Sequence, residues 1–317
     1  MEALMEKENA FYAKLEQRGV SRRNFMQYCT YLTATMGLSS SFVPKVAEVF
    51  AAPKQRPPVI WLHFGECTGC SEALLRSQYP YPDDLVLEIL SVEYHETIMA
   101  AAGHQAEEQL KMAVKKNKGK FICIVEGAIS TKDNGVYGMV GGRTFLEIAK
   151  EVCPQAAAVI CMGTCSSFGG IQAAKPNPGG YKSVSEVLGI KTLNIPGCPP
   201  NPINLVGTIV NYLLLGKLPN LDDKGRPYFA YGKTVHDQCP RRSHFENDEF
   251  VTEFGSEEAA SGYCLYKMGC RGPDTFNNCP TAKFNDGTSW PVEAGHPCIG
   301  CSQPDFWDEM TPFYEEQ

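Results

Sequence analysis

Cysteine placement constrains this chain more than any other feature of its sequence. The 317 residues contain 14 cysteines, and six of them fall between Cys239 and Cys301. So many cysteines indicate disulfides or metal ligands, and the compartment in which the chain folds helps to decide between the two. The length allows a sizeable core and two domains. The formal net charge of −7 argues against a nucleic-acid-binding protein, which needs a basic face.

The first fifty residues indicate export. The stretch SRRNFM (21–26) holds paired arginines, a weakly apolar segment follows, and VFAAPKQ (49–55) offers small residues for cleavage near Ala51 or Ala52. We interpret residues 1–52 as a cleaved twin-arginine signal peptide, in preference to an amphipathic helix with an incidental Arg-Arg. The apolar segment is too short and too polar to span a membrane, and no later stretch approaches ~18 apolar residues. We therefore expect a soluble, periplasmic mature protein without a stable membrane anchor.

This leader also bears on the cysteines. Exported proteins usually oxidise cysteines to disulfides, but the twin-arginine route accepts proteins that fold, and often load a cofactor, before export. Thiolate–metal ligation can then be completed in the reducing cytoplasm, so the leader favours metal ligands over disulfides.

Apolar β-rich runs alternate with helical patterns through residues 53–230. The predicted strands are 57–64, 84–95, 120–129, 156–165 and 191–198, and the predicted helices lie within 67–77, 104–117, 141–152 and 201–216. This alternation predicts an α/β domain with a doubly wound parallel sheet. Residues 231–317 are rich in Gly, Pro, Asn and Cys, which predicts a smaller, loop-rich domain stabilised by metal. The boundary is expected in LPNLDDKGRPYFAYG (218–232).

Four cysteines lie just beyond the ends of predicted strands, namely Cys67, Cys70, Cys165 and Cys198. The carboxyl ends of parallel strands meet at one edge of a sheet, so these thiols are expected to converge there. Four thiolates are what a [4Fe–4S] cluster requires. A redox dithiol formed by Cys67 and Cys70 would leave the other two unexplained. Cysteines inside predicted elements are expected to be buried small hydrophobes: Cys123, Cys153 and Cys161.

The second half of the chain offers two further sets. One combines an imidazole with three thiols, which suits either a Cys3His zinc site or a [4Fe–4S] cluster: His236, Cys239, Cys264 and Cys270. The other has three thiols, which suits a [3Fe–4S] cluster: Cys279, Cys298 and Cys301. Pro291 stands in the loop where a fourth ligand would be expected. Three clusters in one chain would form a series of stepping stones for electrons.

Two other interpretations remain open at this point. The chain could be an exported structural protein held by zinc or disulfides. It could instead be an iron–sulfur subunit of a quinone-linked redox complex, although related chains usually lack the second and third cysteine sets. Flavin binding is disfavoured because the first strand-to-helix turn carries cysteines and no phosphate loop.

The motifs ECTGCSE, GTCSSFGG, IPGCPPNP, VHDQCP, CLYKMGCRGP, NNCP and HPCIGCSQPDFWD, in this order, resemble the small subunit of periplasmic [NiFe] hydrogenases from about Pro57 onward. The resemblance implies a flavodoxin-like domain with a proximal [4Fe–4S] cluster on the strand-end set, a distal [4Fe–4S] cluster on the His236 set and a medial [3Fe–4S] cluster on the remaining set. It also implies electron transfer for H2 ⇌ 2H+ + 2e−. The nickel–iron centre would be in a separate large subunit, forming a heterodimer, and a multihaem c-type cytochrome would dock near His236. No residue of this chain is then expected to be catalytic.

Departures within this family narrow the expectation further. Oxygen-tolerant members carry extra proximal cysteines where Gly69 and Gly170 stand here, so the resemblance implies an oxygen-sensitive enzyme. Where the large subunit holds selenium, a medial cysteine can stand at the position of Pro291, so the proline implies the plain nickel–iron class. Membrane-bound members extend into a C-terminal anchor helix, whereas this sequence ends soon after MTPFY.

Overall fold

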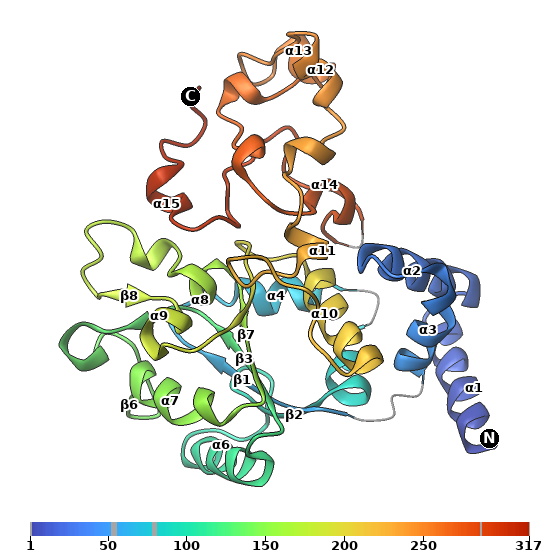
Figure 1. The fold of residues 1–317 in the computed structure, drawn as a ribbon, viewed down its shortest axis with the longest axis vertical. Coiled ribbons are helices and arrows are strands. Elements are labelled where there is room, and N and C mark those ends of the chain that lie inside the picture. The colour runs from blue at the N-terminus through green and yellow to red at the C-terminus, as the bar shows by residue number, and fades with distance from the viewer. Residues whose placement is uncertain (1, 52–55, 78–80, 286, 317) are drawn as a thin grey trace.

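A five-stranded parallel sheet organises the first large unit of the molecule (Figure 1). The computed structural model describes residues 2–51, 56–77, 81–285 and 287–316. The strand order is β2-β1-β3-β7-β9, which is the 2-1-3-4-5 order of flavodoxin-like sheets. The predicted α/β class is thus confirmed. Its strands are β1 (Pro58–His63), β2 (Ser91–His95), β3 (Ile122–Glu126), β7 (Ala158–Met162) and β9 (Leu193–Ile195).

Shorter elements complete the chain. Two antiparallel pairs form from β4 (Ile129–Ser130) with β8 (Tyr181–Lys182) and from β5 (Met139–Val140) with β6 (Arg143–Thr144). The helices before residue 160 are α1 (Glu2–Gln17), α2 (Arg22–Thr35), α3 (Val43–Ala51), α4 (Gly69–Leu75), α5 (Pro82–Asp84), α6 (His104–Asn117) and α7 (Phe145–Val152). The later helices are α8 (Thr164–Phe168), α9 (Val184–Leu188), α10 (Pro202–Leu215), α11 (Tyr228–Tyr231), α12 (Arg242–Glu246), α13 (Glu257–Ala260), α14 (Cys279–Ala282) and α15 (Phe306–Glu309).

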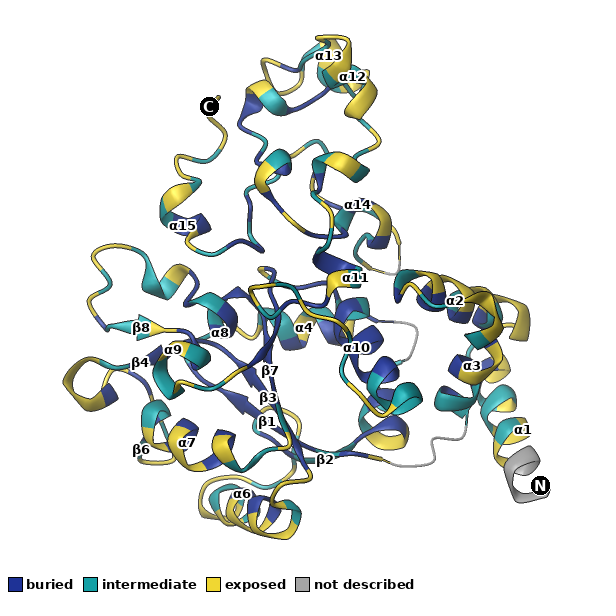
Figure 2. Ribbon diagram, viewed as in Figure 1, coloured by how far each residue is buried: buried dark blue, intermediate teal, exposed yellow. Residues whose placement is uncertain are grey.

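Both faces of the sheet are covered, which explains why the central strands β1, β3 and β7 are mostly apolar and buried (Figure 2). Within β1, Val59 and Trp61 belong to the core that includes α10, whereas Ile60 and Leu62 belong to the core that includes α6 and α7. Alternate residues of one strand therefore supply two hydrophobic layers.

The predicted strand 84–95 is wrong in its first half. Residues 82–89 are helical, continuing from α5 through one π-turn (Leu85–Ile89), and β2 begins only at Ser91. Leu85 and Ile89 are buried, whereas Leu87 between them is 62% exposed. In a strand, Leu85, Leu87 and Ile89 would point to the same face and would be buried together. Burial of Leu85 and Ile89 without Leu87 is instead the spacing of four residues that a helix produces.

The predicted leader is folded against the sheet domain. A hydroxyl of Ser21 caps α2 by accepting from the Asn24 N–H. The apolar face of α2 and α3 packs into the same core as α10 through Phe25, Cys29, Leu32, Val46 and Phe50. Arg18 pairs with the buried carboxylate of Asp84 at 3.1 Å, while Arg22 and Arg23 are exposed. The expected cleavage point lies at the end of α3, and Ala52 is outside the described residues.

The C-terminal part lies beyond the carboxyl ends of the sheet strands, next to α4 and α11 (Figure 1). Its α-helices have at most five residues, and a small apolar cluster fills its interior together with several cysteines. This is the loop-rich architecture that the sequence predicts. The buried apolar members of the cluster are Val235, Val251, Leu265, Met268, Trp290 and Val292. In the described ranges, no helix combines the length and apolar character needed to cross a membrane.

Candidate metal centres

The four strand-end cysteines meet at the carboxyl edge of the sheet, as predicted. Cys70 lies in the first turn of α4, Cys165 lies in the first turn of α8, and Cys198 follows β9. Cys70 interacts electrostatically with Cys67, Cys165 and Cys198. Burial and the nearby charge of Glu126, followed by these thiols, raise the pKa of Cys70 well above its ordinary value. A bound metal would offset this cost, because its positive charge stabilises thiolates.

The backbone of the β7–α8 turn approaches the Cys70 thiol closely. Gly163 has φ of +93°, and a Cβ built there would stand 2.5 Å from the Cys70 sulfur. Only glycine can therefore hold this turn without pushing the thiol aside. Cys67 and Cys198 are exposed, so the set is open on its outer side. The residues present fit a four-thiolate iron–sulfur cluster.

His236 shares a small pocket with the three cysteines with which the sequence groups it. The pocket is lined by His236, Cys239, Cys264 and Cys270, together with Arg241 and Arg242. Burial raises the pKa of Cys264, and the charges of Cys270 and Cys239 add to this effect. Burial and the neighbouring charge of Arg242 lower the pKa of His236. A neutral imidazole is the form that ligates a metal.

The third set surrounds a cavity of about 450 Å³ that also touches Pro291. Cys279 interacts electrostatically with Cys301 and Cys298. The indole N–H of Trp290, a residue that lines this cavity, is buried and has no hydrogen-bond partner among the described residues. A sulfur-rich cluster would fill this cavity and accept a hydrogen bond from the Trp290 indole, so this set also fits its predicted group.

The three sets stand in series. Cys198 of the first set interacts with Cys301 of the third, and the Cys298 N–H of the third donates to the Cys270 sulfur of the second at 3.4 Å. Burial and the charges of Cys270 and Cys301 raise the pKa of Cys298 to about 12. The third set therefore lies between the other two, although it comes last in the chain.

Glu126 and His63, which the sequence analysis did not single out, both lie under the first set. The Glu126 carboxylate accepts from the N–H groups of Cys70 at 3.1 Å and Ser71 at 3.3 Å, and from the Ser71 hydroxyl at 2.6 Å. His63 Nε2 stands 3.2 Å from the Ser71 hydroxyl. Burial alone would raise the pKa of Glu126, but hydrogen bonds from His63 and Ser71 outweigh it and hold this pKa below its usual range. The available signal was a carboxylate closing an otherwise apolar strand.

The predicted burial of the three cysteines inside regular elements is confirmed. Cys123, Cys153 and Cys161 are buried among apolar side chains, and every cysteine in the described residues is a free thiol. Within those same ranges, no three His, Cys, Asp or Glu side chains meet closely enough to hold a single metal ion. The cavity of about 450 Å³ at the third set has room for a larger group.

Two family models match the chain. Residues 67–212 match the model of the NADH ubiquinone oxidoreductase 20 kDa subunit. Residues 231–314 match the model of the C-terminal region of the NiFe/NiFeSe hydrogenase small subunit. The two models divide near the segment that the sequence marks as a boundary.

Relatives resemble the chain over nearly its full length. A periplasmic [NiFe] hydrogenase small subunit of Nitratidesulfovibrio vulgaris is 55% identical over 305 residues, which cover 95% of each chain. The quinone-reactive Ni/Fe-hydrogenase small chain of Wolinella succinogenes is 51% identical, over 95% of this chain and 85% of that one. Among solved structures, a [NiFeSe]-hydrogenase chain of Desulfomicrobium baculatum matches with a TM-score of 0.78 and 37% identity, covering 83% of this chain and all of the other. The chain therefore belongs to the family of [NiFe] hydrogenase small subunits, the electron-transfer components of these oxidoreductases.

Proposed function

We propose that this chain carries electrons between a nickel–iron centre in a large subunit and an external acceptor, for the reaction H2 ⇌ 2H+ + 2e−. The observation that carries the proposal is the serial arrangement of three thiolate-rich sets, connected by Cys198 with Cys301 and by Cys298 with Cys270. An isolated structural metal site would have no need of such a series. When bound, iron–sulfur clusters supply one-electron redox chemistry at each set.

The proposed ligands follow the three sets. The proximal [4Fe–4S] cluster is assigned to Cys67, Cys70, Cys165 and Cys198. The distal [4Fe–4S] cluster is assigned to His236, Cys239, Cys264 and Cys270, and the medial [3Fe–4S] cluster to Cys279, Cys298 and Cys301. The chain's own residues hold thiolates in place, exclude water from the interior sets and leave hydrogen chemistry to the partner.

Replacing Pro291 with cysteine is expected to convert the medial cluster towards four irons and to lower its potential. Pro291 lines the medial cavity with the three thiols, and a fourth thiolate there could complete the missing corner. EPR spectroscopy of the oxidised protein would follow the change as loss of the three-iron signal. An unchanged three-iron signal would count against this assignment.

Two faces are proposed for partners. The exposed thiols Cys67 and Cys198 make the proximal edge the face for the large subunit, because they need cover from water. His236 lies at the other end of the series, beside Arg242, which pairs with Asp237 at 3.6 Å and Glu246 at 3.0 Å. A multihaem c-type cytochrome is the proposed acceptor there. The quinone-reactive relative supports quinone-linked transfer as the second candidate, and reduction assays with each acceptor would separate them.

The proposed organisation is a signal peptide in residues 1–52, the proximal-cluster domain in 53–230 and the medial and distal cluster domain in 231–317. The solved relative, matched over its full length, leaves 17% of this chain unmatched, which is close to the share of residues 1–52.

Changing Arg22 and Arg23 together to lysine is expected to keep the precursor in the cytoplasm, as cell fractionation and blotting would show. Arg18→Lys is the matched control outside the pair, and equal periplasmic yields of all forms would contradict twin-arginine export.

Anaerobic purification tests the function as a whole. The expected preparation is brown, bleaches on reduction, contains iron in place of zinc, and retains a large subunit that holds nickel. A colourless, zinc-loaded protein without a co-purifying subunit would overturn the proposal.

A further inference from the structure

Two buried polar side chains connect the proximal and medial ligand segments. Thr164, which precedes the proximal ligand Cys165, is 1% exposed. Its hydroxyl donates to the carbonyl oxygen of the medial ligand Cys301. The oxygen of the same hydroxyl accepts the N–H of Gly197 at 2.9 Å, next to the proximal ligand Cys198. One hydroxyl thus touches segments that carry two proximal ligands and one medial ligand.

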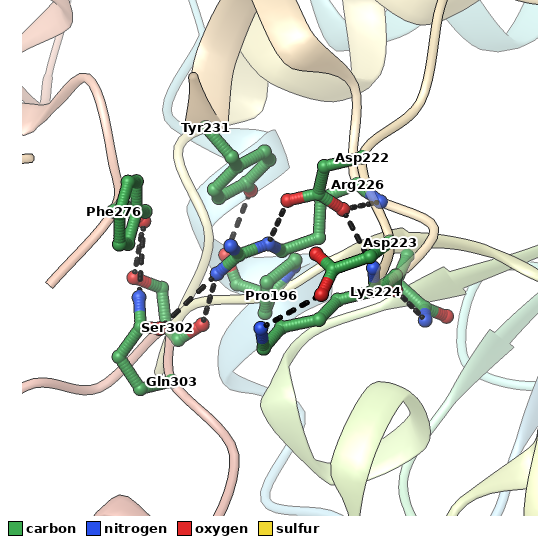
Figure 3. Close-up of polar contacts among 10 residues, drawn as sticks. Pro196, Asp222, Asp223, Lys224, Arg226, Tyr231, Phe276, Ser302 and Gln303 are labelled. Atoms are coloured by element: carbon green, nitrogen blue, oxygen red, sulfur yellow. Dashed lines mark hydrogen bonds and ion pairs between the residues drawn. The ribbon is translucent and has the colours of Figure 1, made fainter. Parts of the chain in front are cut away.

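Arg226 makes a second connection (Figure 3). It is 2% exposed and pairs with Asp222 at 2.8 Å. Its guanidinium also donates to the Ser302 carbonyl at 3.4 Å, one residue beyond Cys301. The Gln303 side-chain amide is oriented with its oxygen facing Arg226. In this orientation the oxygen accepts from the Arg226 guanidinium at 3.2 Å and from the Phe276 N–H at 2.7 Å.

The loop that carries Arg226 is itself fixed to the proximal side. The Asn194 side chain donates to the Lys224 carbonyl at 2.7 Å, and the Asn194 N–H donates to the Gly225 carbonyl at 2.8 Å. Asn194 lies in β9, which leads into Cys198. Tyr231, whose ring lies 5.6 Å from the guanidinium, donates to the Pro196 carbonyl at 2.8 Å. The path from β9 through Arg226 to Ser302 is therefore continuous.

We propose that Thr164 and Arg226 are positioning residues that fix the medial ligand Cys301 against the proximal ligands Cys165 and Cys198. The proposal rests on the cluster assignment proposed above. A loop-rich domain has few regular hydrogen bonds to hold its register, so buried side chains that bond to its carbonyls set the geometry. Electron transfer between the two sets depends on their separation. Thr164 holds that separation at the Cys301 carbonyl, and Arg226 holds it at the next carbonyl along the chain.

The test compares Thr164→Val, Thr164→Ser and Arg226→Gln in the complete heterodimer under anaerobic conditions. Thr208→Val is the matched control, because Thr208 is equally buried but donates only to the Asn204 carbonyl of its own helix. Thr164→Val should raise hydrogen exchange of the Gly197 amide about 2–10-fold, the factor that one lost hydrogen bond gives. It should also broaden and shift the three-iron EPR signal. Arg226→Gln should change the same signal, whereas Thr164→Ser and Thr208→Val should leave it as in the wild type.

Contrary results are equally specific. If Thr164→Val and Arg226→Gln both keep the wild-type EPR spectrum and exchange, neither residue positions Cys301. If Thr164→Val fails to load iron, Thr164→Ser decides: normal loading supports the role of the hydroxyl, and the same failure overturns it. A wild-type protein without any three-iron signal would contradict the proposed medial cluster, while the exchange measurement would still test the link itself.

Discussion

Cys165→Ala is expected to remove about four iron atoms per molecule, the content of one [4Fe–4S] cluster. Hydrogen uptake with an electron acceptor should fall by more than about 100-fold, since even the loss of a residue outside the ligand shell costs up to about that factor in metal affinity or activity. Cys165 interacts with Cys67 and Cys70 at the open edge of the sheet. Iron quantification and the absorbance of the oxidised protein would measure the change.

Cys161→Ala is the matched control for this experiment. Cys161 lies in β7, four residues earlier in the chain, is fully buried, and belongs to the apolar core that includes α6 and α7. Its removal should cost stability through a small cavity but leave the iron content unchanged. Equal iron loss in both variants would mean that general destabilisation, and not ligation, explains the effect. Full iron content in Cys165→Ala would remove Cys165 from the proximal set.

Much of the fold was predictable because its elements obey simple periodicities. The predicted helices at 104–117 and 201–216 agree with α6 and α10 within a residue at each end. The convergence of the strand-end cysteines was predictable for a related reason, since the carboxyl ends of parallel strands meet at one edge of a sheet. The strand predicted over residues 84–90 was wrong because the apolar run suits both a strand and a helix. Only tertiary contacts decide that Leu87 is exposed to solvent.

The side chains that support the sets were beyond sequence reasoning. Thr164 meets a carbonyl 137 residues away, and Glu126 meets amides 56 and 55 residues earlier in the chain. No local period marks such partners. Arg226 lies in a segment whose Gly, Pro and Asp content is typical of a domain boundary. In the folded protein, Arg226 of that segment donates to the Ser302 carbonyl of the C-terminal part.

The packing of the N-terminal segment was likewise not predictable from its sequence pattern. Its arginine pair and small residues follow an export pattern, but nothing in that pattern predicts burial of Cys29 and Leu32 against the core that includes α10. The composition of α10, with Leu, Val and Ile on several faces, explains this burial. A helix that is apolar on more than one side needs cover on each of them. In this structure, α2 and α3 provide that cover.

Glu126→Ala is expected to lower the free energy of unfolding by about 3–5 kcal/mol, because three donors, two of them buried, lose their acceptor at once. These are the N–H groups of Cys70 and Ser71 and the hydroxyl of Ser71. The melting temperature of the anaerobic protein should fall by about 10 °C. The proximal iron should also become easier to remove with a chelator, because the amides that orient the first turn of α4 are no longer held.

Glu126→Gln separates hydrogen bonding from charge in this prediction. The amide oxygen of glutamine can still accept from the two N–H groups, so most of the stability should return. Glu88→Ala serves as the surface control: Glu88 pairs with Arg56, but its side chain is 52% exposed, and such pairs contribute little. If Glu126→Ala has the same melting temperature as Glu88→Ala and the wild type, the buried carboxylate does not hold the proximal turn. If Glu126→Gln is as unstable as Glu126→Ala, the charge and not the acceptor geometry is what the site requires.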